Sequence, residues 1–216
     1  MTTAVTTLFL ARHGETVWHE ENRYTGVSDI DLTPLGLDQA EALGGWAADA
    51  RLDAIVTSPL SRARRTAEPA ARATGLVPVV EPDLLEVDFG IAEGRTLGEL
   101  EASHRQEVAA FLDDPAAHPL PTGEDPMAAA ARGTAALLRA ADGRLGHRVL
   151  AVAHNTLLRL VLCRLLGLPE SEYRRIFPGL RNCAITELRV TAGQVSLMAY
   201  NVPTCDARWA HGARKP

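Results

Sequence analysis

Two histidines of this sequence each follow an apolar stretch, and one of them has an arginine beside it. His13 comes after the run Val5–Ala11 and the cation Arg12. His154 comes after a second apolar run, residues 149–153. An imidazole can attack an electrophile or transfer a proton, and a guanidinium can hold two oxygens of an oxyanion. These residue types therefore indicate a site for an anionic substrate such as a phosphoryl group.

A second guanidinium and a carboxyl group extend this set. Arg62 lies in the first turn of a helical stretch that follows the short apolar run 54–56. Glu86 lies in a loop-like segment, 82–94, and acts as an acid near neutral pH only if its surroundings raise its pKa. Because arginine and protonated histidine can neutralise a phosphoryl group, we expect neither a metal ion nor another cofactor.

These side chains need a sheet that brings strand ends together. Apolar runs alternate with stretches of helical spacing, which predicts an α/β fold with a mostly parallel central sheet. The carboxyl ends of parallel strands meet at one edge, where open α/β sheets bind ligands. The two histidines and two arginines then share this edge. The expected strands are 5–11, 54–56, 77–81, 148–153 and a hairpin of 182–190 and 194–200, and the expected helices are 34–47, 60–73, 96–114, 125–141 and 157–166.

The chain is expected to form one domain, residues 1–216, because it contains no internal repeat and no low-complexity linker. The segment of about 96–127 interrupts the alternation and is predicted to form a short helical lid. We expect a flexible tail at 203–216.

The bulk properties are typical of globular proteins and exclude several classes of function. Of the 216 residues, 46% are hydrophobic and 23% are charged, and the formal net charge of −5 argues against a nucleic-acid partner. No apolar run has the length of a membrane span, and the N-terminus lacks the pattern of a signal peptide. The three cysteines have no paired spacing and indicate reduced thiols. We therefore expect a cytoplasmic protein.

Four separated motifs occur in order along the chain. They are the Arg-His-Gly-Glu-Thr stretch at 12–16 with Trp18 after it, the stretch 58–67, the stretch 85–90 with Glu93 and Gly94 after it, and the stretch 152–154. Together they resemble the signature of the histidine phosphatase superfamily, in its phosphoglycerate mutase-like branch, and especially its small-molecule phosphatases. The resemblance implies a three-layer α/β/α fold with helices on both faces of the sheet.

The resemblance also implies a role for each residue of the site. His13 matches the nucleophile that becomes a phosphohistidine. Glu86 matches the acid that protonates the leaving oxygen and later helps to activate water. Arg12, Arg62 and His154 match the other members of the phosphate pocket.

Two positions depart from the family pattern. His19 stands where many members have an asparagine that contacts the phosphoryl group, and Asn155 stands where many relatives have glycine. An imidazole can still donate a hydrogen bond, and Asn155 is placed to cap a helix or to reach the phosphate. We predict substrate or phosphate contacts for both residues, and also for Thr25 and Gly26.

The choice between phosphatase and mutase depends on two segments. Cofactor-dependent phosphoglycerate mutases have an Arg-His-Tyr-Gly stretch after the acidic residue and an added basic segment with an arginine pair. In this chain the stretch Val87–Gly90 stands in place of Arg-His-Tyr-Gly. The segment 96–125 contains a single arginine, Arg105, and no arginine pair. We therefore favour a metal-independent phosphomonoester hydrolase over a mutase. A non-catalytic member that binds phosphorylated ligands or a protein partner is a third reading, although every presumed catalytic position is filled.

The substrate is a small phosphorylated metabolite whose identity stays open. Phe111, Leu112 and Leu120 of the lid are candidate walls for a leaving group with an apolar part. Sugar phosphates, phosphoglycerate-like acids, nucleotides and cofactor-precursor phosphates such as α-ribazole phosphate all fit. The oligomeric state is equally open, and a homodimer through an edge strand or the 157–166 region is one option.

Overall fold

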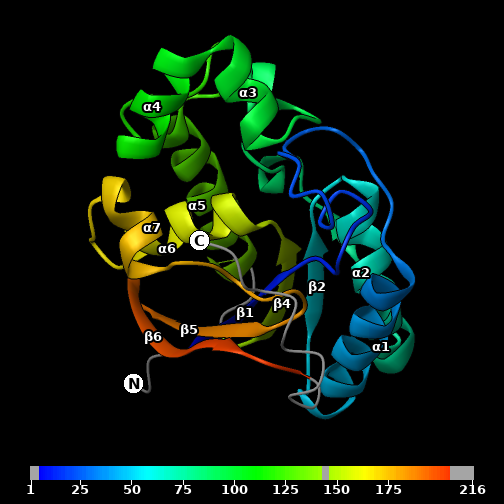
Figure 1. The fold of residues 1–216 in the computed structure, drawn as a ribbon. Coiled ribbons are helices and arrows are strands. Elements are labelled where there is room, and N and C mark those ends of the chain that lie inside the picture. Colours follow the sequence, from blue (N-terminus) through cyan, green and yellow to red (C-terminus); the bar gives the residue numbers. More distant parts are fainter. Residues whose placement is uncertain (1–4, 143–145, 205–216) are drawn as a thin grey trace.

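The computed structural model describes residues 5–142 and 146–204. Apart from Pro203 and Thr204, the predicted tail lies outside the described residues. A six-stranded sheet forms the centre of the molecule, in the order β3-β2-β4-β1-β5-β6 (Figure 1). The strands are β1 (Thr6–Arg12), β2 (Ala54–Thr57), β3 (Val79–Val80), β4 (Arg148–Ala153), β5 (Ile185–Thr191) and β6 (Gln194–Val202).

Helices cover both faces of this sheet, which confirms the three-layer α/β/α arrangement (Figure 1). Successive side chains of a strand point to opposite faces. In β1, Leu8 and Leu10 therefore pack against α5 and α6, whereas Phe9 and Ala11 pack against α1 and α2. The helices are α1 (Pro34–Asp49), α2 (Ser61–Thr74), α3 (Leu97–Ser103), α4 (Arg105–Asp113), α5 (Pro126–Asp142), α6 (Asn155–Leu165) and α7 (Tyr173–Ile176).

The sheet is less uniformly parallel than the sequence predicts. The β1–β4, β2–β4 and β2–β3 pairs are parallel, whereas β5 is antiparallel to both β1 and β6. The predicted hairpin is present, and Ala192 and Gly193 in its turn have φ angles of 50° and 78°. A turn this short forces β6 to return beside β5, so both strands extend the sheet at one edge.

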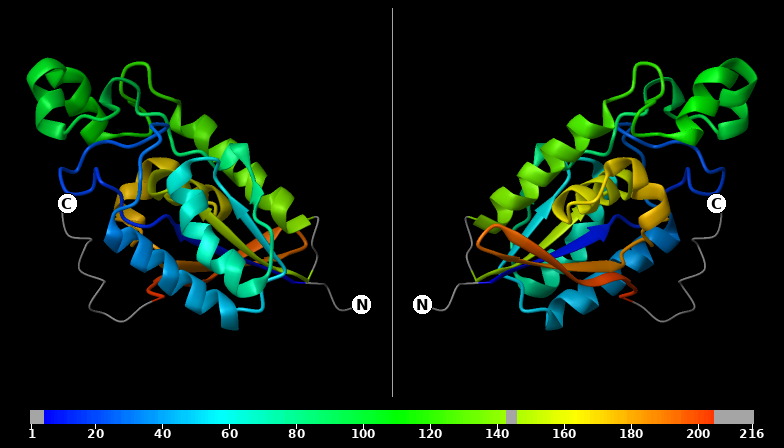
Figure 2. Two further views of the ribbon diagram at one scale, coloured as in Figure 1. Left: turned by 90° about the vertical axis from the view of Figure 1, so that its right-hand side faces the viewer. Right: turned by 90° about the vertical axis from the view of Figure 1, so that its left-hand side faces the viewer.

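The lid differs from the single helix predicted at 96–114. The chain leaves helical geometry at His104, where φ is −141° and ψ is 46°, and so divides into α3 and α4. Leu100 of α3 and Phe111 of α4 pack into one small cluster with Ala92 and Leu120. Tertiary packing thus overrides a continuous helical pattern. Both views in Figure 2 place α3 and α4, in green, at one end of the molecule.

Two smaller features complete the fold. Strand β3 is limited to Val79–Val80, shorter than the predicted 77–81, because it pairs with β2 through these two residues alone. In the part of the chain that the structure describes, no helix is both long and apolar enough to span a membrane.

Candidate active site

The carboxyl ends of β1, β2 and β4 carry the site. His13 follows β1, and its backbone N–H donates to the carbonyl oxygen of Ala153 at 3.0 Å. Ser58 follows β2, and its N–H donates to the carbonyl oxygen of Val152 at 3.0 Å. His154 follows β4 itself. The two imidazole rings consequently lie with their centroids 5.2 Å apart.

The imidazole of His13 is held in one tautomer. Its Nδ1–H donates to the carbonyl oxygen of Gly14 at 2.7 Å, which leaves the lone pair on Nε2. Burial, with the nearby His154 and Arg62, lowers the pKa of His13 well below its ordinary value. The ring is therefore neutral near pH 7, the form in which Nε2 can attack an electrophile. The Nδ2 group of Asn182 donates to the His13 carbonyl oxygen at 2.7 Å and fixes the backbone.

Gly14 lets the end of β1 pack directly against a helix. A Cβ atom at this position would lie 2.4 Å from the carbonyl oxygen of Gly36 in α1. On its other side, the N–H of Gly14 donates to Oγ1 of Thr66 in α2 at 2.9 Å. These contacts with two helices set the direction in which His13 leaves the strand.

His154 is fully buried. Its Nε2 lies 2.7 Å from the hydroxyl of Ser58, and its Nδ1 has no partner among the described residues. Burial and the charges of Arg62 and Arg12 lower its pKa well below the ordinary value. A phosphoryl dianion bound nearby would raise this pKa again and favour the form that donates two hydrogen bonds.

Two guanidinium groups lie within electrostatic range of His13, that of Arg62 fully buried and that of Arg12 partly buried at the cavity wall. Arg12 donates to the carbonyl oxygen of Leu180 at 2.9 Å, and Arg62 donates to two carbonyl oxygens of the segment 26–28 at 2.6 and 2.7 Å. The Nε of each is buried without a partner within the described ranges. Burial lowers the pKa of Arg12 to about 10 and also lowers that of Arg62. Because a buried cation is costly, both groups favour an incoming oxyanion.

Glu86 lies at the N-terminus of α6. Its Oε1 accepts the N–H groups of Val87 and Leu157 at 2.9 and 2.8 Å, and its Oε2 accepts that of Thr156 at 2.9 Å. Burial raises the pKa of Glu86, although these three N–H groups and Arg62 act in the opposite direction. Since Oε2 accepts one hydrogen bond and Oε1 accepts two, Oε2 is the better position for a transferable proton.

Arg132 of α5 fixes the segment that carries Glu86. It donates to the carbonyl oxygens of Asp83, Leu85 and Glu86 at 2.8, 2.7 and 3.1 Å. Two further bonds of 2.7 Å join it to the carboxylate of Glu124. The carboxyl group of Glu86 is thereby held at the start of α6 from both the helix and the loop.

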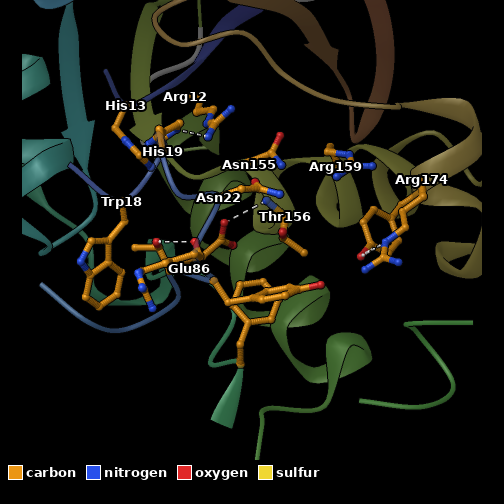
Figure 3. A pocket seen from close by; sticks show the side chains of 15 residues that line it. Arg12, His13, Trp18, His19, Asn22, Glu86, Asn155, Thr156, Arg159 and Arg174 are labelled. Atoms are coloured by element: carbon orange, nitrogen blue, oxygen red, sulfur yellow. Dashed lines mark hydrogen bonds between the residues drawn. The ribbon is translucent and has the colours of Figure 1, made fainter. Parts of the chain in front are cut away.

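A cavity of about 220 Å³ opens beside these groups. Arg12, His13 and Glu86 line it (Figure 3), whereas Arg62 and His154 are buried and are not among its lining residues. No group of three or more His, Cys, Asp or Glu side chains in the described part of the chain is arranged to hold a metal ion. The aromatic walls of the cavity come from Trp18, Tyr24, Phe89 and Tyr173.

The lid residues predicted as pocket walls do not line this cavity, although Phe111 and Leu120 line a smaller one that shares Phe89, Thr156 and Tyr173 with it. Phe111 and Leu120 are buried in the cluster inside the lid, and the side chain of Leu112 is exposed. A short two-helix insertion has little apolar surface, so it uses these side chains for its own core.

His19 lines the cavity and links β1 to the loop after it. Its Nε2 lies 2.6 Å from Nη2 of Arg12, and its Nδ1 lies 2.8 Å from Oγ1 and 3.0 Å from the backbone N of Thr16. Burial and the charge of Arg12 lower the pKa of His19 to about 3, so the ring is neutral. A phosphate contact by His19 stays a prediction.

Asn155 and Thr25 also line the cavity. The Oδ1 of Asn155 accepts the N–H of Leu180 at 3.0 Å, so Asn155 holds a distant loop, and the N-cap of α6 is His154. The hydroxyl of Thr25 donates to the carbonyl oxygen of Arg23 at 3.1 Å. The remaining amide group of Asn155 and the lone pairs of the Thr25 hydroxyl leave both residues able to contact a ligand.

Gly26 supports Arg62 and does not line the cavity. Its carbonyl oxygen accepts from Arg62, and its N–H donates to Oε1 of Glu93 at 2.9 Å. A Cβ atom on Gly26 would lie 2.2 Å from that oxygen. Glu93 also accepts the N–H groups of Ser28 and Phe89 at 3.2 Å. The sequence did not reveal this positioning role, because the contacts join residues 67 positions apart.

Three arginines that the sequence did not indicate also line the cavity, and one of them, Arg23, forms ion pairs with Glu21 and Glu99. The other two are Arg159 of α6 and Arg174 of α7, both outside the lid segment, which was noted for lacking the arginine pair of the mutases. Arg159 is four residues after Asn155, so the two share a face of α6. This spacing is the signal from which Arg159 could have been found.

A neutral histidine, two guanidinium groups and a carboxyl group lie together at one sheet edge, an arrangement that suits a phosphoryl group. Residues 8–203 match the model of the histidine phosphatase superfamily (branch 1). The chain belongs to this superfamily, as its four motifs predict.

Individual relatives carry names of two kinds. Probable phosphoglycerate mutase GpmB of Erwinia tasmaniensis is 35% identical over 181 residues, which cover 84% of this chain and 83% of that protein. The mycobacterial glucosyl-3-phosphoglycerate phosphatase has a TM-score of 0.83 at 28% identity and covers 92% of this chain and 99% of its own. The α-ribazole phosphatase of Shigella flexneri has a TM-score of 0.82 at 27% identity, with coverages of 91% and 96%.

Proposed function

We propose that this protein is a metal-independent phosphomonoesterase that acts on a small metabolite through a phosphohistidine at His13. The observation that carries the proposal is the state of that imidazole. Its Nδ1 donates to Gly14, its Nε2 has no hydrogen-bond partner among the described residues, and burial keeps it neutral. Arg12 and Arg62 lie nearby, and the Nε of each has no partner within the described ranges, so they favour the negative oxygens of a phosphoryl group.

The proposed reaction has two steps at phosphorus. Nε2 of His13 attacks the phosphorus atom while the bond to the leaving oxygen breaks, and Glu86 gives that oxygen its proton. A water molecule then attacks the phosphohistidine, Glu86 takes a proton from the water, and inorganic phosphate leaves as His13 is restored. The arginines neutralise the phosphoryl oxygens throughout, and water must reach the intermediate for hydrolysis to prevail.

Two observations favour hydrolysis as the main reaction. The stretch Val87–Gly90 after the acidic residue lacks the arginine, histidine and tyrosine of the mutase pattern. The structural relatives described above are named as phosphatases, of glucosyl-3-phosphoglycerate and of α-ribazole phosphate.

Phosphate release from a panel of phosphomonoesters tests the proposal. The panel contains p-nitrophenyl phosphate, glycerol 3-phosphate, 3-phosphoglycerate, ribose 5-phosphate and a nucleoside monophosphate, each assayed with and without EDTA. We expect release that EDTA leaves unchanged and that His13→Ala lowers by at least about 10³-fold. His118→Ala is the matched control, because His118 is an exposed histidine of the lid segment and does not line the cavity. Loss of activity with EDTA, or full activity of His13→Ala, would contradict the proposal.

A phosphoglycerate mutase is the second candidate, because the curated relative at 35% identity carries that name. Incubation with 3-phosphoglycerate and catalytic 2,3-bisphosphoglycerate distinguishes the two reactions. A hydrolase releases inorganic phosphate, whereas a mutase forms 2-phosphoglycerate with little net release.

A further inference from the structure

Arg159 is a buried cation that forms no ion pair with any of the described residues. Its side chain lines the cavity, yet the residue is only 6% exposed. Its Nε donates to the carbonyl oxygen of Phe177, and its guanidinium lies 4.7 Å from the ring centroid of Tyr173. Within residues 5–142 and 146–204, its two terminal nitrogens have no hydrogen-bond partner and no carboxylate. Burial lowers its pKa, which reflects the cost of holding this charge.

Arg174 is a second cation on the same wall, and its side chain is partly exposed. Its Nε donates to the Tyr173 hydroxyl at 3.2 Å, and its guanidinium lies 5.8 Å from that ring and 4.6 Å from the ring of Phe111 in the lid. It forms no ion pair with any residue that the structure describes. Tyr173 thus has a guanidinium on each side, and its hydroxyl proton is free to donate to an anion.

The two arginines lie away from the phosphoryl end of the cavity. Figure 3 shows Arg159 and Arg174 on one side of the pocket and Arg12 and His13 on the other. The acidic side chain that lines the cavity, Glu86, is hydrogen-bonded to the start of α6; its charge acts on Arg159 from a distance, and it pairs with neither arginine. One phosphoryl group therefore leaves the cations at the far end unneutralised.

A purely structural role does not account for this arrangement. Anchoring the carbonyl oxygen of Phe177 requires one donor, which a neutral side chain could supply. A buried guanidinium costs several kcal/mol unless an anion or a full set of hydrogen bonds compensates it. The terminal N–H groups of Arg159 and Arg174 form planar forks, a geometry that fits two oxygens of a carboxylate or phosphate.

We propose that Arg159, Arg174 and Tyr173 form a second anion subsite, so that the substrate is a phosphomonoester with a further acidic group on its leaving portion. This inference rests on the proposed phosphomonoesterase activity and narrows its substrate class. A carboxylate and a second phosphate share the chemistry that these donors recognise.

A matched set of three-carbon phosphomonoesters tests the subsite. In 3-phosphoglycerate a carboxylate replaces the terminal CH₂OH of glycerol 3-phosphate, and glycerol 1,3-bisphosphate supplies a second phosphate instead, with the C2 hydroxyl kept in all three. We expect kcat/KM of the wild type to be about 10- to 100-fold higher for an acidic ester than for glycerol 3-phosphate. The ester with the higher kcat/KM identifies which acidic group the subsite takes.

Three variants separate recognition from folding. Arg174→Gln and Arg159→Gln should each lower the preference for the acidic ester about tenfold or more, mainly through KM, and leave glycerol 3-phosphate within about twofold. Arg175→Gln is the control. This substitution removes the same charge, but Arg175 is exposed and pairs with Glu172. If Arg159→Gln unfolds, as thermal melting would show, Arg174→Gln alone decides, since its side chain is partly exposed.

The outcomes distinguish this inference from the proposed function. Activity on p-nitrophenyl phosphate and glycerol 3-phosphate without a preference for an acidic ester overturns the subsite and leaves the phosphatase. Equal losses on acidic and neutral esters in Arg174→Gln also overturn it. If the wild type hydrolyses no ester, calorimetric binding to His13→Ala still decides, because the subsite requires tighter binding of 3-phosphoglycerate than of glycerol 3-phosphate.

Discussion

At the scale of single residues, the site places ionisable groups where water cannot solvate them. Burial lowers the pKa of His13 and His154 and raises that of Glu86. These shifts keep the imidazoles neutral and favour a protonated carboxyl group, the two forms that a nucleophile and a general acid require. The sequence predicted a nucleophile at His13 and an acid at Glu86. The pKa shifts of these groups depend on burial, which the spacing of residues along the chain does not show.

Substitution of Glu86 by glutamine tests its role as the acid. Glu86→Gln should lower kcat for glycerol 3-phosphate by about 10²- to 10⁴-fold, and that for p-nitrophenyl phosphate by less than about tenfold, because p-nitrophenolate leaves without a proton. In the wild type, the rate on glycerol 3-phosphate should fall as the pH rises through the raised pKa of Glu86. Equal losses on the two substrates, measured by phosphate release, would remove Glu86 from this role.

At the scale of elements, three strand ends and two helices hold the reacting groups. The N–H groups at the start of α6 donate to the carboxylate of Glu86, and α5 holds the backbone of the same residue through Arg132. The alternation of strands and helices was predictable from the sequence. The pairing of α5 with the segment 83–86 was not, because Arg132 is separated from Glu86 by 46 positions.

Arg132→Met is expected to loosen the segment that carries Glu86. The loss of its hydrogen bonds should lower the free energy of unfolding by about 1–3 kcal/mol, measured with urea. Because the carboxyl group of Glu86 then loses its position, kcat should fall more on glycerol 3-phosphate than on p-nitrophenyl phosphate. Arg139→Met is the control on the same helix, since Arg139 is half-exposed and binds Glu81 and Asp83. A stability loss without this dependence on the leaving group would limit Arg132 to a structural role.

At the scale of the whole molecule, three neutral histidines link stability to pH: His13 and His154, which are buried, and His19, which is partly buried. The pKa values of His13, His19 and His154 are lowered on folding, in the case of His19 to about 3. Below the ordinary pKa of about 6.5, the unfolded chain therefore binds more protons than the folded one. Stability must fall as the pH falls through that value, whereas the raised pKa of Glu86 acts in the opposite direction.

Urea unfolding at pH 7.5 and at pH 5.5 measures this linkage. Each histidine should contribute about 1.4 kcal/mol to the loss of stability between these two pH values. The variant His154→Gln should show a smaller loss than the wild type by about that amount. An unchanged difference between the two pH values would mean that His154 is charged in the folded protein.

The sequence by itself determined the α/β class, the site at the strand ends and the superfamily. Local spacing encodes these features, because apolar runs and turn residues fix elements over short distances. The tertiary structure alone decided that β4 lies between β1 and β2 and brings His154 to His13. It also decided that the lid keeps its apolar residues for its own core, and that Arg159 and Arg174 line the cavity. These outcomes depend on contacts between distant segments, which compete for the same buried surface and which no local pattern specifies.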